Sequence, residues 1–184
     1  IDATMLLVRD LLKNRSLPAD VVICVIPLYN IDGSLNRSST SRANQNGPEA
    51  YGFRGNAQNL DLNRDFIKTD SKNSYAFQRI FNQWNPDVFV DTHVSNGADY
   101  QYVMTLIETQ KDKLNPILST YMTNNLIPTL YQEMKNVGFP MTPYVDHIGE
   151  TPDSGISGFL ETPRFATGYA TLHNAISFIT ETHM

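Results

Sequence analysis

The chain has 184 residues, of which 41% are apolar and 18% charged, a length and composition typical of one compact domain. Its single cysteine, Cys24, excludes a disulfide-stabilised scaffold and a zinc site built from several cysteines. A net charge of −5 with scattered basic residues argues against a nucleic-acid partner, and no apolar run approaches the roughly 18 residues that a membrane span requires.

Both ends of the sequence predict that it belongs to a larger domain. Position 1 is Ile rather than Met, and no leader-like segment precedes the first expected helix. The last expected element is an apolar strand that almost reaches the end of the sequence. We therefore expect residues 1–184 to form a single but incomplete domain.

Helical spacing of apolar residues recurs along the chain. It predicts helices over residues 3–13, 74–84 and 115–135, and a short helix over 169–173. Because proline lacks an N–H and clashes with the preceding turn, we expect the third helix to break near Pro128.

Short apolar runs predict the strands. The unbroken run 21–26, between Pro18 and Pro27, is typical of a central strand covered on both faces, with Cys24 buried inside it. Residues 27–62 and 138–151 read as loops. The remaining strands are expected over 88–91, 101–107, 156–161 and 175–182.

Strands that alternate with helices predict an α/β fold. We expect a three-layer sandwich, in which a mixed, largely parallel central sheet is flanked by helices.

His93 is the first candidate site residue. It follows Asp91 where a buried strand ends, which is where α/β proteins place functional side chains. A histidine there binds a metal or acts as a base, and Asp91 would orient its ring. The structural alternative is a histidine that only bonds backbone at the strand end.

Asn63 and Arg64 form a second candidate site, after a glycine-rich loop. Arginine binds a carboxylate through two parallel hydrogen bonds, and asparagine adds a donor. Arg42 and Arg54 lie in the same loop region, which suggests an anionic substrate group. The alternative is an ion pair of Arg64 with Asp61 or Asp65.

Glu181 ends the last apolar strand, on the same strand face as His183. A carboxylate in a partly apolar cleft has a raised pKa and acts as a general base. The alternative is an exposed strand-end carboxylate. Glu161 and Arg164 are expected to pair with each other around a Thr-Pro turn.

Four motifs occur in order along the chain. They are Pro-x-x-Asn-x-Asp-Gly at 27–33, Asp-x-Asn-Arg-x-Phe at 61–66, Asp-x-His at 91–93, and a final strand with Glu181. In this order they resemble the zinc metallocarboxypeptidases of the pancreatic-carboxypeptidase type, over nearly the whole chain. Residues 44–49 and 52–56 resemble a bacterial subgroup. The resemblance implies the phosphorylase/hydrolase-like carboxypeptidase fold.

The resemblance also implies roles. His93 would be the third ligand of one Zn²⁺ ion, and Glu181 the general base that activates water. Asn63 and Arg64 would hold the free C-terminal carboxylate of a peptide substrate.

Other roles are assigned less directly by the resemblance. Arg42 or Arg54 would stabilise the oxyanion. Tyr169 or Tyr144 would cap the substrate.

One part of the family pattern is missing. The His-x-x-Glu motif that supplies the first two zinc ligands does not occur, and its place would be just upstream of Ile1. We therefore expect the chain alone to be inactive.

Two other functions stay open on the sequence: a non-catalytic peptide- or glycan-binding domain on the same scaffold, and an amidohydrolase of cell-wall peptides. The resemblance suggests an exported, periplasmic or secreted protein. The sequence gives no oligomeric state.

Overall fold

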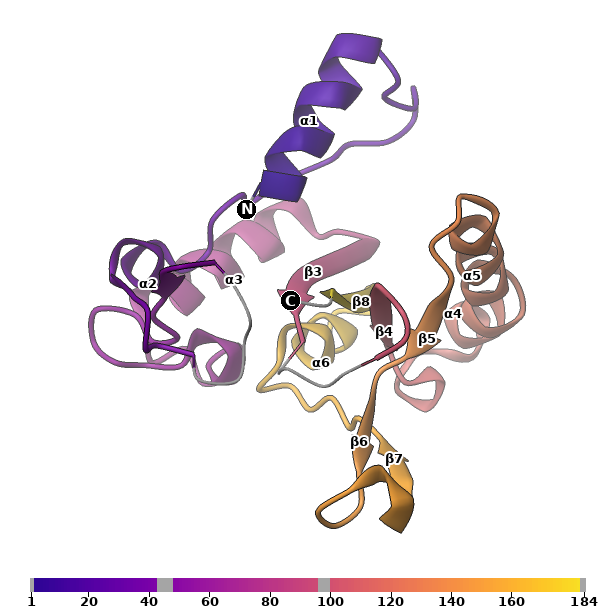
Figure 1. Cartoon of the computed structure of the whole chain (residues 1–184). Helices are drawn as coiled ribbons and strands as arrows, with labels where there is room; N and C mark the ends of the chain where they lie inside the picture. The colour runs from indigo at the N-terminus through magenta and orange to yellow at the C-terminus, as the bar shows by residue number, and fades with distance from the viewer. Residues whose placement is uncertain (1, 43–47, 96–99, 183–184) are drawn as a thin grey trace.

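The structure, a computed structural model, describes residues 2–42, 48–95 and 100–182. Its centre is a four-stranded sheet (Figure 1). In spatial order the strands are β3 (Val88–Val94), β8 (Ile176–Thr182), β4 (Met104–Glu108) and β5 (Met141–Pro143). β3 pairs with β8 in parallel, as β4 does with β5, whereas β4 and β8 are antiparallel. The predicted mixed, largely parallel sheet is confirmed.

One face of the sheet is covered by α3 (Lys72–Trp84) and α6 (Ala166–Thr171). Ser71 caps α3 by accepting from the Ser74 N–H at 3.0 Å, and Asn85 ends it in the left-handed conformation. An aromatic cluster joins these helices to β3, and Phe77 is its hub: its ring lies 5.1 Å from that of Phe66 and 5.7 Å from that of Phe89. Offset and edge-to-face ring pairs of this kind stabilise a core beyond the area they bury.

The opposite face is covered by α4 (Pro116–Tyr121) and α5 (Ile127–Asn136). A π-helical turn, Met122–Leu126, separates them and ends two residues before Pro128. A widened turn accommodates the proline ring and its missing N–H, so the predicted break is confirmed. The sheet therefore lies between two helical layers, as predicted.

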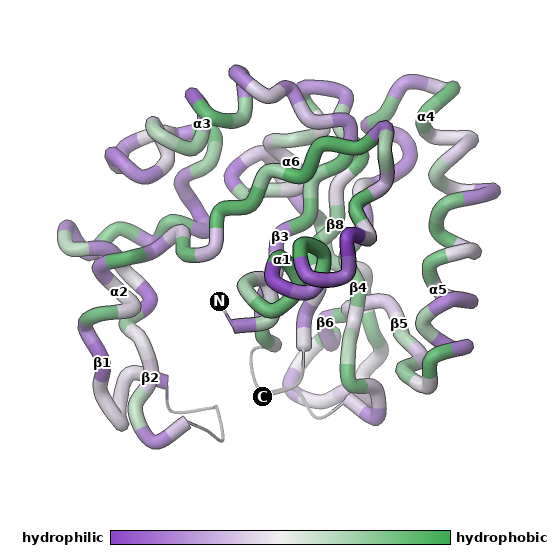
Figure 2. Tube along the Cα trace, turned by 90° about the horizontal axis from the view of Figure 1, so that it is seen from above, coloured by the Kyte–Doolittle hydropathy of each residue, from purple (hydrophilic) through white to green (hydrophobic). Residues whose placement is uncertain are grey.

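The N-terminal segment departs from prediction. Helix α1 (Asp2–Asn14) forms as expected but has no buried residue. Residues 21–26 form no strand and are mostly exposed, with Val22 77% exposed and Cys24 at the surface. Figure 2 shows them as a continuous hydrophobic stretch between α1 and α2. The prediction was wrong because no described strand pairs with this run.

The expected loop regions contain short elements. The first region holds α2 (Ile31–Leu35) and the 3₁₀ turn η1 (Leu62–Arg64), besides a two-stranded ribbon of β1 (Arg37–Ser38) and β2 (Tyr51–Gly52).

The second region contributes to a separate hairpin that projects from the body in Figure 1. It pairs β6 (Val145–His147) with β7 (Ile156–Gly158), so the strand predicted over 156–161 lies outside the central sheet. Two further 3₁₀ turns are η2 (Lys111–Lys113) and η4 (Pro152–Ser154). None of the helices in the described part of the chain is long and apolar enough to cross a membrane.

Asp65 fixes the turn between η1 and α3. It is buried, and its carboxylate accepts the N–H groups of Asp70 and Ser71, each at 2.9 Å. Burial alone would raise the pKa of Asp65, but these donors, together with the Ser71 and Ser74 hydroxyls, hold it below its usual value. The turn thereby sets the position of Arg64 relative to α3.

We expect Asp65→Asn to lower the free energy of unfolding by about 1–3 kcal/mol, because a buried amide NH₂ replaces an acceptor. Since the folded-state pKa is depressed, the contribution of Asp65 is present at neutral pH and lost as pH falls below about 4. Urea titrations at pH 7 and pH 3 measure both effects. The control is Asp70→Asn, whose exposed side chain pairs with Lys68; equal losses in the two variants would contradict the assignment.

Candidate active site

The parallel pairing of β3 with β8 brings His93 and Glu181 together. The two are direct partners in the ladder, and their side chains share the sheet face that carries Phe89. His93 Nδ1 lies 3.6 Å from Glu181 Oε1, and Nε2 lies 2.8 Å from Asp91 Oδ2. The imidazole is thus held between two carboxylates, with Asp91 in the orienting position that the sequence predicted.

The environment raises the pKa of both groups. Burial is the main cause for Glu181, whose pKa rises to about 7; the charge of Asp91 adds to this, while His93, Arg42 and Arg54 oppose it. Burial lowers the pKa of His93, but the Asp91 hydrogen bond and the two negative charges outweigh it, so the net shift is upward. Glu181 Oε2 is buried and has no hydrogen-bond partner among the described residues.

The Asn63–Arg64 pair lies in η1, which Asp61 caps by accepting the Asn63 N–H at 3.0 Å. Arg64 does not form the ion pair with Asp61 or Asp65 that the sequence left open. Arg54 Nε pairs with Asp61 Oδ2 instead, at 2.8 Å. The Arg64 guanidinium donates to the Asn63 carbonyl at 2.8 Å and lies over the Phe165 ring, 4.4 Å from its centroid. Asn63 Oδ1 is buried without a partner in the described part of the chain.

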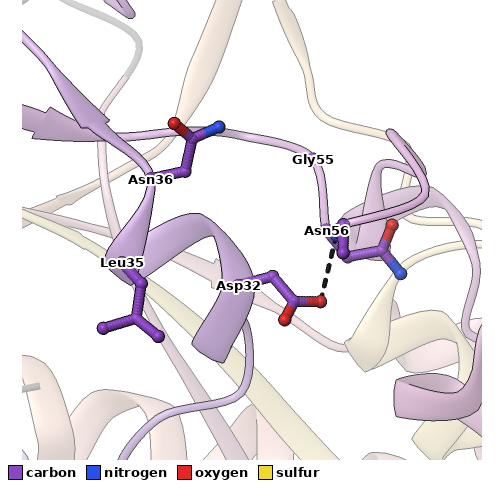
Figure 3. Close-up of a pocket in the computed structure, with 6 residues that line it drawn as sticks. Asp32, Leu35, Asn36, Gly55 and Asn56 are labelled. Atoms are coloured by element: carbon purple, nitrogen blue, oxygen red, sulfur yellow. Dashed lines mark hydrogen bonds between the residues drawn. The ribbon is translucent and has the colours of Figure 1, made fainter.

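Asn30 and Asp32 hold the loop that carries Arg54. The Asn30 amide donates to the carbonyls of Arg54 and Gly55, at 3.1 and 3.2 Å, while its oxygen accepts the Gly33 N–H. Asp32 accepts the Ala57 N–H at 3.0 Å, the dashed line beside a pocket of about 410 Å³ in Figure 3.

Gly33 is required where α2 meets this loop, because a Cβ there would lie 2.2 Å from the Phe53 carbonyl oxygen. The Asn-x-Asp-Gly turn therefore has a structural role: it sets where Arg54 stands.

The charge of Arg42 also interacts with the charges of the site. Burial lowers its pKa and the nearby Arg54 lowers it further, whereas the charges of Asp61 and Glu181 raise it. Arg42 and Arg54 both interact electrostatically with Glu181, so the structure brings both oxyanion candidates toward one carboxylate.

The two tyrosine candidates separate clearly. Tyr169 is 4% exposed and packs in the aromatic cluster against Phe81, so it is not brought to His93 and Glu181. The half-buried Tyr144 interacts electrostatically with Glu181. Burial raises the pKa of Tyr144 to about 12, and the charges of Asp146 and Glu181 contribute. His183 lies outside the described residues.

The turn after β7 contains Glu161 and Arg164, whose predicted pairing is wrong. Glu161 does not pair with Arg164 but with Lys113, at 3.1 Å. Arg164 instead lies over Phe165, the ring that Arg64 also contacts. Local spacing favoured the wrong pair, because Lys113 lies 48 residues from Glu161 in the sequence.

The described side chains around His93 supply only part of a metal site. Within residues 2–42, 48–95 and 100–182, no three His, Cys, Asp or Glu side chains converge to hold an ion. His93 nevertheless has the arrangement of a metal-binding histidine: one ring nitrogen is bound to a carboxylate and the other is turned toward Glu181. The chain thus fits a metal as the source of one ligand.

Comparison with known proteins gives no sequence-level match: neither the family models nor the curated proteins match this chain. Solved structures do match, among them two metallo-carboxypeptidases. One is a metallo-carboxypeptidase from Burkholderia cenocepacia, at 19% identity and a TM-score of 0.48. The other is a metallo-carboxypeptidase from Pseudomonas aeruginosa in complex with (2-guanidinoethylmercapto)succinic acid, at 15% identity and a TM-score of 0.51.

Each likeness covers 72% of this chain and 32% of the matched chain, so the chain spans about a third of the length of these structures. The fold assignment rests on the Pseudomonas structure, whose TM-score is above 0.5. The chain shares a metallo-carboxypeptidase fold. The predicted fold class is thereby confirmed. At this low sequence identity the likeness concerns the fold alone, so any chemistry has to be argued from the residues of this chain.

The raised pKa of Glu181 predicts how the free energy of unfolding of the metal-free protein changes with pH. Because the folded state holds this proton more tightly than the unfolded chain, stability is fully present below about pH 4.5 and falls as pH rises toward about 7. The expected loss is up to about 3 kcal/mol. Chemical denaturation across this range, compared with Glu181→Gln, measures it; the variant should show a clearly flatter profile, and an equally steep one would contradict the burial of Glu181.

Proposed function

We propose that this chain carries part of the active site of a zinc-dependent carboxypeptidase, which removes C-terminal residues from peptides. The observation that supports it best is the β3–β8 register, in which His93 stands between Asp91 and Glu181. We further propose that the other zinc ligands belong to a His-x-x-Glu motif outside this sequence.

His93 is the proposed zinc ligand of this chain. Its Nε2 is held by Asp91 at 2.8 Å, which fixes the tautomer and leaves Nδ1 as the ligand atom. When bound, zinc supplies Lewis-acid chemistry: it polarises a peptide carbonyl and makes water a stronger acid.

Glu181 is the proposed general base. Burial raises the pKa of Glu181, which favours a carboxylate that takes a proton from water and then gives it to the leaving amine nitrogen. The Oε2 atom of Glu181 is buried and accepts no hydrogen bond from the described residues, so it is free to accept a proton. Arg42 and Arg54, both close enough to influence Glu181, are proposed to stabilise the developing oxyanion.

Arg64 and Asn63 are proposed to bind the free carboxylate of the substrate. Arg64 has no carboxylate partner among the described residues, and its guanidinium lies on Phe165, so it is available to an external anion. The Pseudomonas structure was in complex with a substituted succinic acid, a molecule with two carboxylates, which supports an anion-binding role at this fold's site.

A non-catalytic binding domain is the less favoured alternative, because it would retain the cost of a buried carboxylate with one unpartnered oxygen without using it. An amidohydrolase of cell-wall peptides would share the proposed chemistry and differ only in the shape of the substrate pocket.

The decisive variant is Glu181→Gln in the full-length, zinc-loaded protein. Loss of the base should lower kcat/KM on peptides with a free C-terminus by about 10²–10⁴-fold. Zinc content by elemental analysis should stay unchanged. Glu133→Gln, an exposed position on α5, is the matched control. Undiminished turnover by Glu181→Gln, or equal cleavage of C-terminally amidated peptides, would refute the proposal.

A further inference from the structure

Two guanidinium groups share one aromatic ring at the edge of the site. Arg64 Cζ lies 4.4 Å from the centroid of Phe165, and Arg164 Cζ lies 5.6 Å from it. The two Cζ atoms are therefore at most about 10 Å apart. The ring is itself fixed, since Phe165 is 9% exposed and packs edge-on against Phe159 at 5.1 Å.

An ion pair of a buried carboxylate with a partly exposed lysine anchors the turn that carries Arg164 and Phe165. Glu161 is fully buried, and its Oε1 accepts Lys113 Nζ and the Gln110 N–H, both at 3.1 Å. Lys113 Nζ also donates to the Glu161 carbonyl. Removing one partner of such a pair is costly, so the turn is held firmly from the core side.

A backbone bond ties this turn to the segment of Arg64. The Arg164 carbonyl accepts the Phe66 N–H at 3.3 Å, two residues beyond Arg64. The side chain of Arg164, by contrast, is exposed. The fold thus fixes the backbone of both arginines relative to each other and leaves their guanidinium groups open to a ligand.

The charge around Arg64 is not balanced by the protein. Arg54 pairs with Asp61 at 2.8 Å, whereas neither Arg64 nor Arg164 pairs with a carboxylate among the described residues. Burial lowers the pKa of Arg64, and although Asp61 opposes this, the like charges of Arg54 and Arg164 lower it further. Two unpaired cations held close together favour an anion with two negative groups.

We propose that Arg164 is a specificity residue that binds a second carboxylate, so that the preferred substrates are peptides ending in glutamate or aspartate. This rests on the proposed function, because Arg64 is taken to hold the terminal carboxylate while Arg164 binds the acidic side chain. Phe165 supports both guanidinium groups on one rigid surface, which limits the entropy lost on binding.

Equilibrium binding tests this with three peptides identical except at the last position: Glu, Gln, and Glu with an amidated C-terminus. The full-length, zinc-loaded protein is used with Glu181→Gln, which prevents turnover. We expect the Glu peptide to bind about tenfold more tightly than the Gln peptide, as one charge-assisted contact allows.

Arg164→Gln should reduce this ratio to about one without weakening the Gln peptide, and Arg164→Lys should retain part of it. Arg79→Gln, an exposed arginine on α3, is the matched control and should leave the ratio unchanged. The Arg164 side chain is exposed, so these changes leave the interior packing in place; the contact that Arg164→Gln loses is the one with the face of Phe165.

Two results would overturn the inference, and they are distinguishable. Equal binding of the Glu and Gln peptides, or an unchanged ratio in Arg164→Gln, would refute the role of Arg164 while leaving the proposed carboxypeptidase function standing. If the amidated peptide bound as tightly as the free acid, the role of Arg64 and with it the proposed function would fail as well.

Discussion

The parallel ladder between β3 and β8 is the constraint on which the site depends. Because successive residues of a strand point to opposite faces, a slip of one position would turn Glu181 away from His93. Both faces of β8 oppose such a slip. Phe178 is buried against the α4–α5 layer, and on the other face the Ser177 hydroxyl lies 2.7 Å from that of buried Thr109. The core thus fixes the register, and the register creates the site.

The rest of the site comes from loops that are tied to this frame at a few points. Asn30 holds the carbonyls of the Arg54 loop, and Asp65 fixes the turn that follows Arg64. The buried carboxylate of Glu161, paired with Lys113, anchors the Arg164 turn. Each anchor is a buried or half-buried polar group that bonds backbone, so the arginines stand in defined positions although they lie outside the regular elements.

The electrostatic pattern divides the site in two. Carboxylates lie on the strands, where Asp91 and Glu181 flank His93, and arginines lie on the surrounding loops. A metal and a proton are favoured at the first group, and carboxylates of a ligand at the second. The proposed reaction, peptide hydrolysis from a free C-terminus, would use both groups.

Local pattern was enough to predict most helices and the central strands β3, β4 and β8, because apolar spacing is visible in sequence, but it missed β5, which lies in a region expected to be loop. The site roles of His93, Arg64 and Glu181 stay predictions. It failed where the outcome depends on distant partners. Residues 21–26 look like a central strand, yet an apolar run carries no information on whether a neighbouring strand pairs with it.

The same limit explains two other errors. Glu161 pairs with Lys113 rather than with Arg164, its near neighbour in sequence. Tyr169 lies in the aromatic core instead of facing the substrate. Both outcomes follow from the packing of segments far apart in the chain, which spacing alone does not encode.

The most direct test of the central claim is an anomalous difference map at the zinc edge, from crystals of the full-length protein grown with zinc. The account predicts a peak within coordination distance of His93 Nδ1, with Asp91 still bound to Nε2 and with Glu181 beside the ion but not among its ligands. A peak elsewhere in the molecule, or a zinc ion bound without His93, would contradict it.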